Sequence, residues 1–181
     1  MILSSEPVIL VEDTREQLGY SDLFTVPCRR GALDVGDYSV VGLEELVAVE
    51  RKTLQDLVGS VTHDRDRFER ELKRSRTLHR FFVVLEFRPS DLLVESFGGM
   101  SKASPASVWG TVMAWSIRYS PFLFAGSRAH GARITQGILA AYAKGIIKNY
   151  VVFGKAQGRS GDGEEGKKAK GKNKDTASTP T

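Results

Sequence analysis

The chain has 181 residues, of which 41% are hydrophobic and 27% charged, with a formal net charge of +4 at pH 7. This length suffices for one domain with a sizeable core, and no apolar run approaches the roughly 18 residues that a membrane span needs. The mild basic excess permits nucleic-acid binding without requiring it. A lone cysteine, Cys28, excludes an internal disulfide and fits a reducing compartment. With no signal peptide evident, we expect an intracellular protein without a membrane partner, cytoplasmic in a prokaryote or virus and nuclear in a eukaryote.

Residues 8–11 are a β-branched run that predicts a first strand, with an Asp-x-x-Glu element at its carboxyl end. Asp13 and Glu16 of that element could extend an acidic cluster, and Arg15 between them could touch a phosphate. The alternative is a turn, because Asp and Thr side chains cap chain reversals through hydrogen bonds to the backbone. Residues 26–30 favour an edge strand, since the proline among them limits backbone pairing.

A hairpin is predicted next along the chain. Its two strands begin near Leu33 and at Val47, and residues 41–46 connect them. In that pairing, Asp37 of the first strand lies beside Glu50 of the second. The alternative is an ordinary exposed strand end whose charges are solvated.

Three charged residues in succession end the second strand of this hairpin: Glu50, Arg51 and Lys52. Side chains alternate faces along a strand, so Glu50 and Lys52 point one way and Arg51 the other. Together with Asp37, they place two carboxylates and a lysine at one strand end, which suits a hard divalent cation. The lysine can orient or activate a metal-bound water, or stabilise charge building on a phosphate.

The segment Thr53-Leu54-Gln55-Asp56 has the spacing of a helix-capping box, so Asp56 is either a cap or a support for the acidic cluster. A short helix is predicted from Leu54 to about Val61, and a charged helix follows over residues 63–74. Its alternating charges favour a solvated, salt-bridged face. The alternative is that its arginines grip phosphates flanking a cleaved bond; these are Arg65, Arg67 and Arg74.

Residues 81–86 form an apolar run closed by Glu86, which is typical of a central strand buried on both faces. We interpret Glu86 as a plain strand-end carboxylate, with proximity to the acidic site as the alternative. A loop over residues 88–104, a helix over 105–119 and a short strand over 121–125 follow.

The last predicted helix runs from about Ser127 to Lys148. Its apolar stripe either packs on the sheet or joins two copies of the chain; the stripe comprises Ile134, Ile138, Tyr142 and Ile146. Residues 150–153 are interpreted as a final apolar latch. Residues 158–181 contain alanine as their only apolar residue type, so we predict a disordered tail after a folded domain over residues 1–157.

This series of elements resembles the XPF-type structure-specific endonucleases. The resemblance extends from about Val8 to about Tyr150 without large insertions. It rests on Gly36-Asp37, Glu50-Arg51-Lys52 with Asp56 following, Asp13-Thr14-Arg15-Glu16, and Arg67-Phe68. It implies an α/β fold with a restriction-endonuclease-like core, in which helices flank a central mixed β-sheet.

The same resemblance implies a metal-dependent DNA endonuclease, selective for branched or flapped DNA in repair or recombination. Lys52 would position the attacking water, and Arg51 would order the acidic cluster or contact phosphate. Mg²⁺ or Mn²⁺ would be held by Asp37 and Glu50, with Asp13 and Glu16 supporting or extending the site.

The rival interpretation is a non-catalytic DNA-binding or scaffolding subunit of a nuclease complex, because this family includes inactive partners. Inactive members have lost the acidic residues that are present here, which favours the enzyme. Many relatives append helix-hairpin-helix or helicase domains, and neither is visible in this sequence. We therefore expect that two copies form a homodimer, that a partner protein supplies DNA binding, or that the enzyme acts weakly alone.

Overall fold

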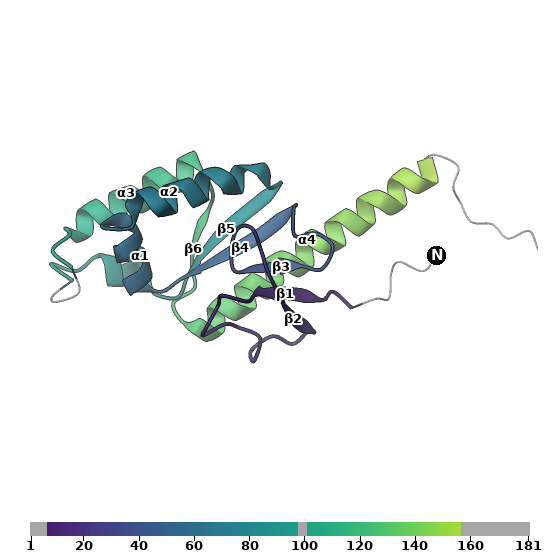
Figure 1. The fold of residues 1–181 in the computed structure, drawn as a ribbon, viewed down its shortest axis with the longest axis horizontal. Helices are drawn as coiled ribbons and strands as arrows, with labels where there is room; N and C mark the ends of the chain where they lie inside the picture. The colour runs from purple at the N-terminus through teal and green to yellow at the C-terminus, as the bar shows by residue number, and fades with distance from the viewer. Residues whose placement is uncertain (1–6, 98–100, 157–181) are drawn as a thin grey trace, which may run out of the picture.

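A computed structural model describes residues 7–97 and 101–156, which form a six-stranded sheet with helices on both faces (Figure 1). The strands are β1 (Leu10–Asp13), β2 (Cys28–Gly31), β3 (Tyr38–Val40), β4 (Val47–Lys52), β5 (Arg80–Leu85) and β6 (Phe122–Phe124). The α-helices are α1 (Leu54–Val61), α2 (Arg65–Arg74), α3 (Pro105–Arg118) and α4 (Arg128–Ala156), and the 3₁₀ helices are η1 (Ser75–Thr77) and η2 (Pro89–Leu92).

The sheet is mixed, as expected, and its strand order is β2-β1-β3-β4-β5-β6. Strand β1 pairs in parallel with β2 and antiparallel with β3, and β3 pairs antiparallel with β4. Strands β4, β5 and β6 are parallel, so their carboxyl ends lie at one edge of the sheet. The predicted hairpin is therefore confirmed, with Tyr38 opposite Val49.

Side-chain alternation along β4 divides the core into two layers. Ala48 belongs to the cluster packed against α1, α2 and α3, whereas Val47 and Val49 belong to the cluster packed against α4. The same alternation places Glu50 and Lys52 on the α1–α3 face of the sheet. Arg51, between them, points to the α4 face.

Helix α4 differs from its prediction at its carboxyl end. The predicted stripe does pack on the sheet, because Ile134, Ile138 and Tyr142 contact the second core cluster. The helix does not end at Lys148 but continues to Ala156, since no proline or left-handed glycine stops it.

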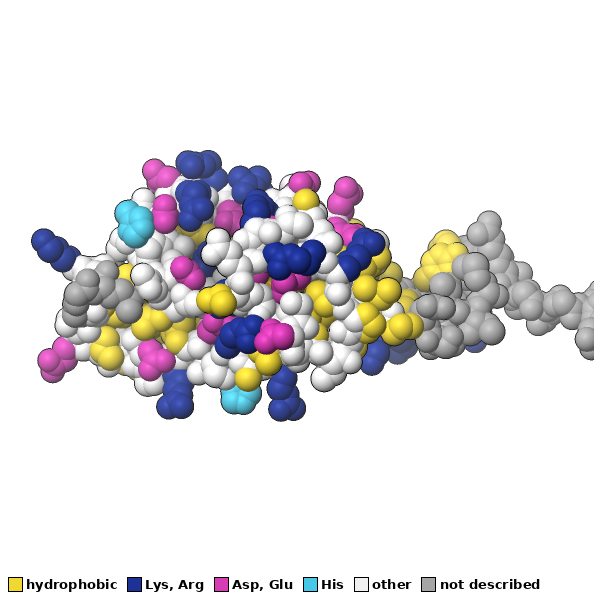
Figure 2. Space-filling view, turned by 60° about the horizontal axis from the view of Figure 1, so that its bottom comes forward, with side chains coloured by type: hydrophobic (Ala, Val, Ile, Leu, Met, Phe, Trp, Pro, Cys, Tyr) yellow, Lys and Arg dark blue, Asp and Glu magenta, His cyan; other side chains and the backbone are white. Residues whose placement is uncertain are grey.

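The predicted apolar latch at residues 150–153 is wrong, because these residues are turns of α4 beyond the sheet (Figure 1). Their side chains are exposed, Phe153 by 63%. Figure 2 shows hydrophobic side chains gathered at that end of the molecule, whereas acidic and basic side chains intermingle elsewhere on this face. Neither α4 nor any other helix within the described residues is long and apolar enough to cross a membrane. The predicted tail, residues 158–181, lies outside the described residues.

Two glycines of α4 offer a matched test of its packing. A Cβ at Gly131 would overlap the hydroxyl group of Tyr20, which is fully buried and stacks on Tyr38 with ring centroids 4.9 Å apart. A Cβ at Gly137 would meet no atom within 4 Å. Gly131→Ala should therefore lower the free energy of unfolding by about 1–3 kcal/mol through overpacking. Gly137→Ala should raise it by up to about 1 kcal/mol, because alanine favours helix.

Urea denaturation of both variants measures these changes. Equal effects of the two substitutions would show that Tyr20 and α4 do not pack as described.

Candidate active site

Asp37 is positioned by the residue before it and by the strand beside it. Gly36 has a φ of +77°, and a Cβ there would lie 3.2 Å from the Val49 carbonyl oxygen, so glycine suits this position. The backbone N–H of Asp37 donates to that same carbonyl at 2.9 Å. Its carboxylate Oδ2 accepts from the backbone N–H of Arg51 at 2.7 Å. Asp37 thus lies across from Glu50, as the hairpin predicted.

Glu50 and Lys52 face the same side of β4, as strand alternation predicted. Lys52 Nζ donates to Glu50 Oε1 at 2.6 Å. The ammonium also lies 4.4 Å from the centroid of the Phe68 ring on α2, where a cation–π contact stabilises it. The Glu50 side chain is only 6% exposed and that of Lys52 only 12%. Two carboxylates and one ammonium therefore share a desolvated corner at the carboxyl end of β4.

The electrostatics of this corner favour binding of a proton or a cation. Burial and the neighbouring Glu50 charge raise the pKa of Asp37 well above its usual range. Burial likewise raises the pKa of Glu50 to about 7, although Lys52 opposes the shift. Burial lowers the pKa of Lys52, but the Glu50 carboxylate outweighs it and the net shift is upward. With both carboxylates ionised, one negative charge remains uncompensated by this lysine.

A further carboxylate, Glu71 of α2, approaches this corner and was not predicted. It contributes to the raised pKa of Glu50 and to that of Lys52. The sequence shows Glu71 within the charged helix, directly before Leu72, which is fully buried. That adjacency to a core position is the one signal that could have placed Glu71 at the inner edge of the helix.

Arg51 lies on the opposite face of β4 and binds two carboxylates there. Its Nε and Nη2 donate to Oε1 and Oε2 of Glu86, each at 2.8 Å, and its Nη1 donates to Glu16 at 3.3 Å. The guanidinium also lies 5.7 Å from the centroid of the Tyr20 ring. Glu86 therefore lies beside the site rather than at a plain strand end, because its N–H extends the β4–β5 ladder to the Lys52 carbonyl at 2.9 Å.

Asp13 is not brought to the Asp37–Glu50 corner. Its side chain is 1% exposed, and its two oxygens accept from the Arg15 side chain at 2.7 and 3.1 Å and from the Leu33 N–H at 2.7 Å. Burial raises the pKa of Asp13, but these hydrogen bonds outweigh it, so the pKa is lowered overall. The element around Asp13 has the local hydrogen bonds of a turn, which was the alternative interpretation.

The predicted four-carboxylate set is consequently divided. Asp37 and Glu50 face each other, Asp13 binds Arg15, and Glu16 binds Arg51. Glu16 remains close enough to raise the pKa of Asp37. Within residues 7–97 and 101–156, no three His, Cys, Asp or Glu side chains are arranged to hold a metal ion. Two of the four carboxylates bind nearby arginines. Spacing along the sequence does not reveal these ion pairs.

A cleft of about 390 Å³ opens over this corner. Asp56 lines it and also completes the predicted capping box, because its carboxylate accepts from the Thr53 hydroxyl at 2.6 Å and its N–H donates back at 3.2 Å. Both interpretations of Asp56 therefore fit its position. The cleft is lined by Arg15, Glu16, Gln17, Leu18, Asp37, Glu50, Arg51, Lys52, Thr53 and Asp56.

The predicted DNA-contacting arginines of α2 are exposed but lie outside the lining of this cleft. Arg65 pairs with Glu69 at 3.2 Å, and Arg67 pairs with Asp64 at 3.5 Å. Arg74 makes no ion pair within the described part of the chain. Their solvated, partly salt-bridged positions agree with both interpretations of the charged helix.

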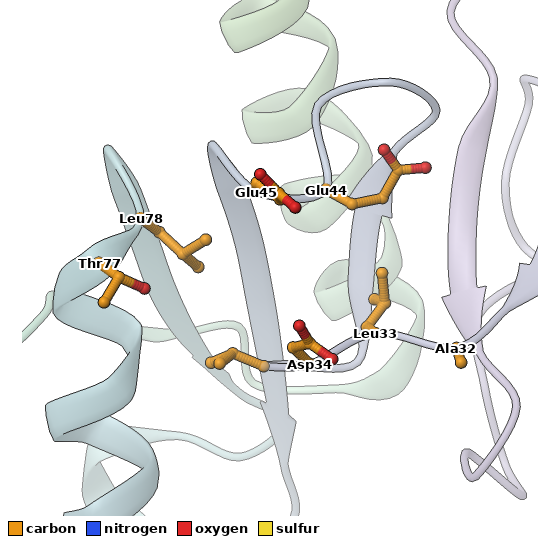
Figure 3. A pocket seen from close by; sticks show the side chains of 8 residues that line it. Ala32, Leu33, Asp34, Glu44, Glu45, Thr77 and Leu78 are labelled. Atoms are coloured by element: carbon orange, nitrogen blue, oxygen red, sulfur yellow. The ribbon is translucent and has the colours of Figure 1, made fainter.

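A larger cavity lies elsewhere. It measures about 540 Å³ and contains none of the motif residues (Figure 3). Glu44 and Glu45 on its wall precede β4, and Thr77 and Leu78 precede β5, so this wall lies at the amino ends of these strands. The motif residues lie at the carboxyl end of β4, so the size of a cavity does not identify the cleft that they line.

The mixed sheet with its motif residues at the β3–β4 hairpin has the fold of an XPF-type domain. Residues 7–137 match the model of the ERCC4 domain, and the chain belongs to that family. No curated protein matches it.

Two of the solved structures that are similar to this chain are of XPF from Aeropyrum pernix. XPF from Aeropyrum pernix in complex with DNA is 21% identical with a TM-score of 0.60, and the match covers 77% of this chain and 66% of that one. XPF from Aeropyrum pernix is 20% identical with a TM-score of 0.56, with 73% and 65% covered. At this identity the likeness shows the fold, and the chain spans about two thirds of the length of either structure.

The raised pKa of Glu50 predicts how stability depends on pH without metal. A carboxyl group whose pKa rises from 4.5 to about 7 on folding stabilises the folded state below pH 4.5, and this contribution is lost as pH rises through 7. In EDTA, the melting temperature should therefore fall between pH 5 and pH 8. Glu50→Gln should flatten that fall, because the group no longer titrates.

Differential scanning calorimetry at several pH values measures the slope. Glu45→Gln is the matched control, since Glu45 is exposed and should leave the slope unchanged. An unaltered slope in Glu50→Gln would contradict the burial of an ionisable Glu50.

Proposed function

We propose that this chain is a divalent-metal-dependent DNA endonuclease that hydrolyses phosphodiester bonds. The observation that carries the proposal is the gathering of Asp37, Glu50 and Lys52 in a desolvated corner beneath a cleft. Membership of the ERCC4 domain family supports it. So does the similarity to the structure of XPF from Aeropyrum pernix in complex with DNA.

Asp37 and Glu50 fit a hard divalent cation, Mg²⁺ or Mn²⁺. They offer carboxylate oxygens in a low-dielectric corner, where their mutual repulsion is relieved by a cation. Glu16 is a further carboxylate on the cleft wall, and its charge acts on Asp37. Asp13 supports the site from behind by donating its N–H to the Asp37 carbonyl at 2.8 Å. When bound, the ion would lower the pKa of a water nucleophile and stabilise charge on the phosphate.

Lys52 and Arg51 take different roles in this proposal. The raised pKa of Lys52 keeps its ammonium charged at neutral pH, so it can donate a hydrogen bond to the attacking water or to a phosphate oxygen. The Arg51 guanidinium is 9% exposed and already donates to Glu86 and Glu16. Those contacts favour the role of ordering the acidic cluster over that of contacting phosphate.

Basic side chains around the cleft would bind the DNA backbone. Arg15 lines the cleft with a side chain that is 72% exposed, although it also binds Asp13. Arg65, Arg67 and Arg74 would extend these contacts along α2. A small number of such contacts is enough to hold only a short duplex segment. We therefore propose selectivity for branched or flapped DNA, as in repair or recombination.

A homodimer or a DNA-binding partner protein would add the remaining affinity. The exposed turns of α4 at residues 150–153 offer apolar surface for such an association. An intracellular location stays a prediction from the sequence. The rival function, a non-catalytic DNA-binding or scaffolding subunit, differs in predicting DNA binding without cleavage.

The decisive variant is Asp37→Asn, which keeps the size of the side chain and removes its charge. Cleavage should fall by several orders of magnitude, because activation of water and stabilisation of the phosphate both depend on the ion that this carboxylate would hold. DNA binding should persist, since a charge that repels phosphate has gone. Labelled duplex, flap, fork and four-way-junction substrates with Mg²⁺, Mn²⁺ or EDTA provide the measurement.

Asp34→Asn is the matched control, because Asp34 lies in the same connection but on the wall of the other cavity. It should cleave normally. Near-normal cleavage by a folded Asp37→Asn protein would remove the assignment of the site. Absence of cleavage by the unaltered protein on every substrate would favour the scaffolding function.

The contribution of α2 to DNA binding is tested by Arg67→Ala combined with Arg74→Ala. The double variant should bind a flap several-fold more weakly at low salt, and the slope of log affinity against log salt should decrease in magnitude by about one to two. Fluorescence anisotropy over a salt series measures both quantities. Arg118→Ala, at the exposed end of α3, is the control; equal effects of the two would indicate general charge rather than an α2 contact.

A further inference from the structure

The Arg51–Glu86 pair is a bidentate charged contact next to the site. Both hydrogen bonds are 2.8 Å long, and both side chains are 9% exposed. A bidentate guanidinium–carboxylate pair in such surroundings fixes the orientation of both groups. Glu86 belongs to none of the sequence motifs that define the proposed site.

The Arg51–Glu86 pair also affects the opposite face of β4, because Arg51 contacts both faces of this strand. The backbone N–H of Arg51 donates to Asp37 Oδ2 at 2.7 Å. Arg51 therefore contacts the acidic corner through its backbone, while its guanidinium lies on the other face of β4. A buried guanidinium without a carboxylate is costly, and it turns toward whichever carboxylates remain within reach. Glu16 already accepts one hydrogen bond from Arg51 and lies near Asp37. Without Glu86, the guanidinium would therefore turn toward Glu16 and Asp37.

We propose that Glu86 is a positioning residue that holds the Arg51 charge on the α4 face of β4. By doing so it leaves Asp37 and Glu50 short of positive charge and therefore able to bind a divalent cation. This inference rests on the proposed function, because it concerns the cation that those carboxylates would hold. Glu86 itself touches neither DNA nor the cation.

The test uses Mn²⁺ alone, titrated into the full chain by isothermal calorimetry. Glu86→Gln keeps the shape of the side chain and removes the charge that neutralises Arg51. Mn²⁺ affinity should fall tenfold or more, because an uncompensated positive charge then competes with the cation for the carboxylates. Cleavage of a flap substrate should recover as Mn²⁺ concentration is raised, since the reacting groups themselves remain.

Asp22→Asn is the matched control. Asp22 forms another close arginine–carboxylate pair, with Arg128 at the start of α4, at 2.6 Å. Its loss should change Mn²⁺ affinity by less than twofold, because no β4 charge is released.

The double variant Arg51→Met with Glu86→Gln distinguishes positioning from a merely structural role. Removing both charges takes away the competitor, so Mn²⁺ affinity should return to within a few-fold of the unaltered protein. A purely structural Glu86 predicts no such recovery. Arg51→Met alone also removes the competing charge, so its Mn²⁺ affinity should stay within a few-fold of the unaltered protein even though Glu16 loses its arginine partner, and this variant tests the inference even where Glu86→Gln does not fold.

Three results would overturn the inference while leaving the proposed function intact. They are unchanged Mn²⁺ affinity in folded Glu86→Gln, no recovery in the double variant, and a tenfold loss of affinity in folded Arg51→Met. If the unaltered protein binds no Mn²⁺ and Asp37→Asn is no different, the proposed function fails and the inference fails with it.

Discussion

The backbone of Asp37 is the point at which three strands are held together. Its N–H donates to the Val49 carbonyl of β4 at 2.9 Å, and its carbonyl accepts from the Asp13 N–H of β1 at 2.8 Å. Gly36 makes this possible by adopting a positive φ where a side chain would press on β4. The carboxylate is consequently placed by main-chain hydrogen bonds rather than by a mobile loop. The rest of the site is arranged around that fixed group.

Strand alternation then separates the charges at the end of β4 into two sets. Glu50 and Lys52 lie on the face covered by α1–α3, and Arg51 lies on the face covered by α4. Each set is desolvated by the core layer that ends beside it, so each charge needs a partner. Glu86 meets that need for Arg51, because the parallel β4–β5 register continues by one residue beyond Leu85. The alternation of side chains along β4 thus creates both the Glu50–Lys52 corner and the Arg51–Glu86 pair on the opposite face.

The sequence allowed prediction of the features that depend on local patterns. The hairpin, the opposed faces of Glu50 and Arg51 and the cap at Asp56 follow from alternation and spacing, and the structure has all three. Glu71 was missed, and the proximity of Glu86 to the site was only the alternative interpretation, because both positions depend on helix packing or strand register, which join segments far apart in the chain. Asp13 lies near Arg15 in the sequence. Whether Asp13 binds this arginine or joins the distant carboxylate corner depends on an energetic balance, which spacing along the sequence does not reveal.

The pattern of ion pairs sets Asp37 apart from the neighbouring carboxylates. Around the carboxyl ends of β1 and β4, Glu12 binds Arg30, Asp13 binds Arg15, and Glu50 binds Lys52. Within the described residues, Asp37 forms no ion pair, although it is largely desolvated and Glu50 raises its pKa. A network selected for stability alone would compensate such a group, since an unpaired buried charge opposes folding. Leaving one carboxylate unpaired while neutralising its neighbours lowers stability locally, and the proposed cation would relieve this imbalance.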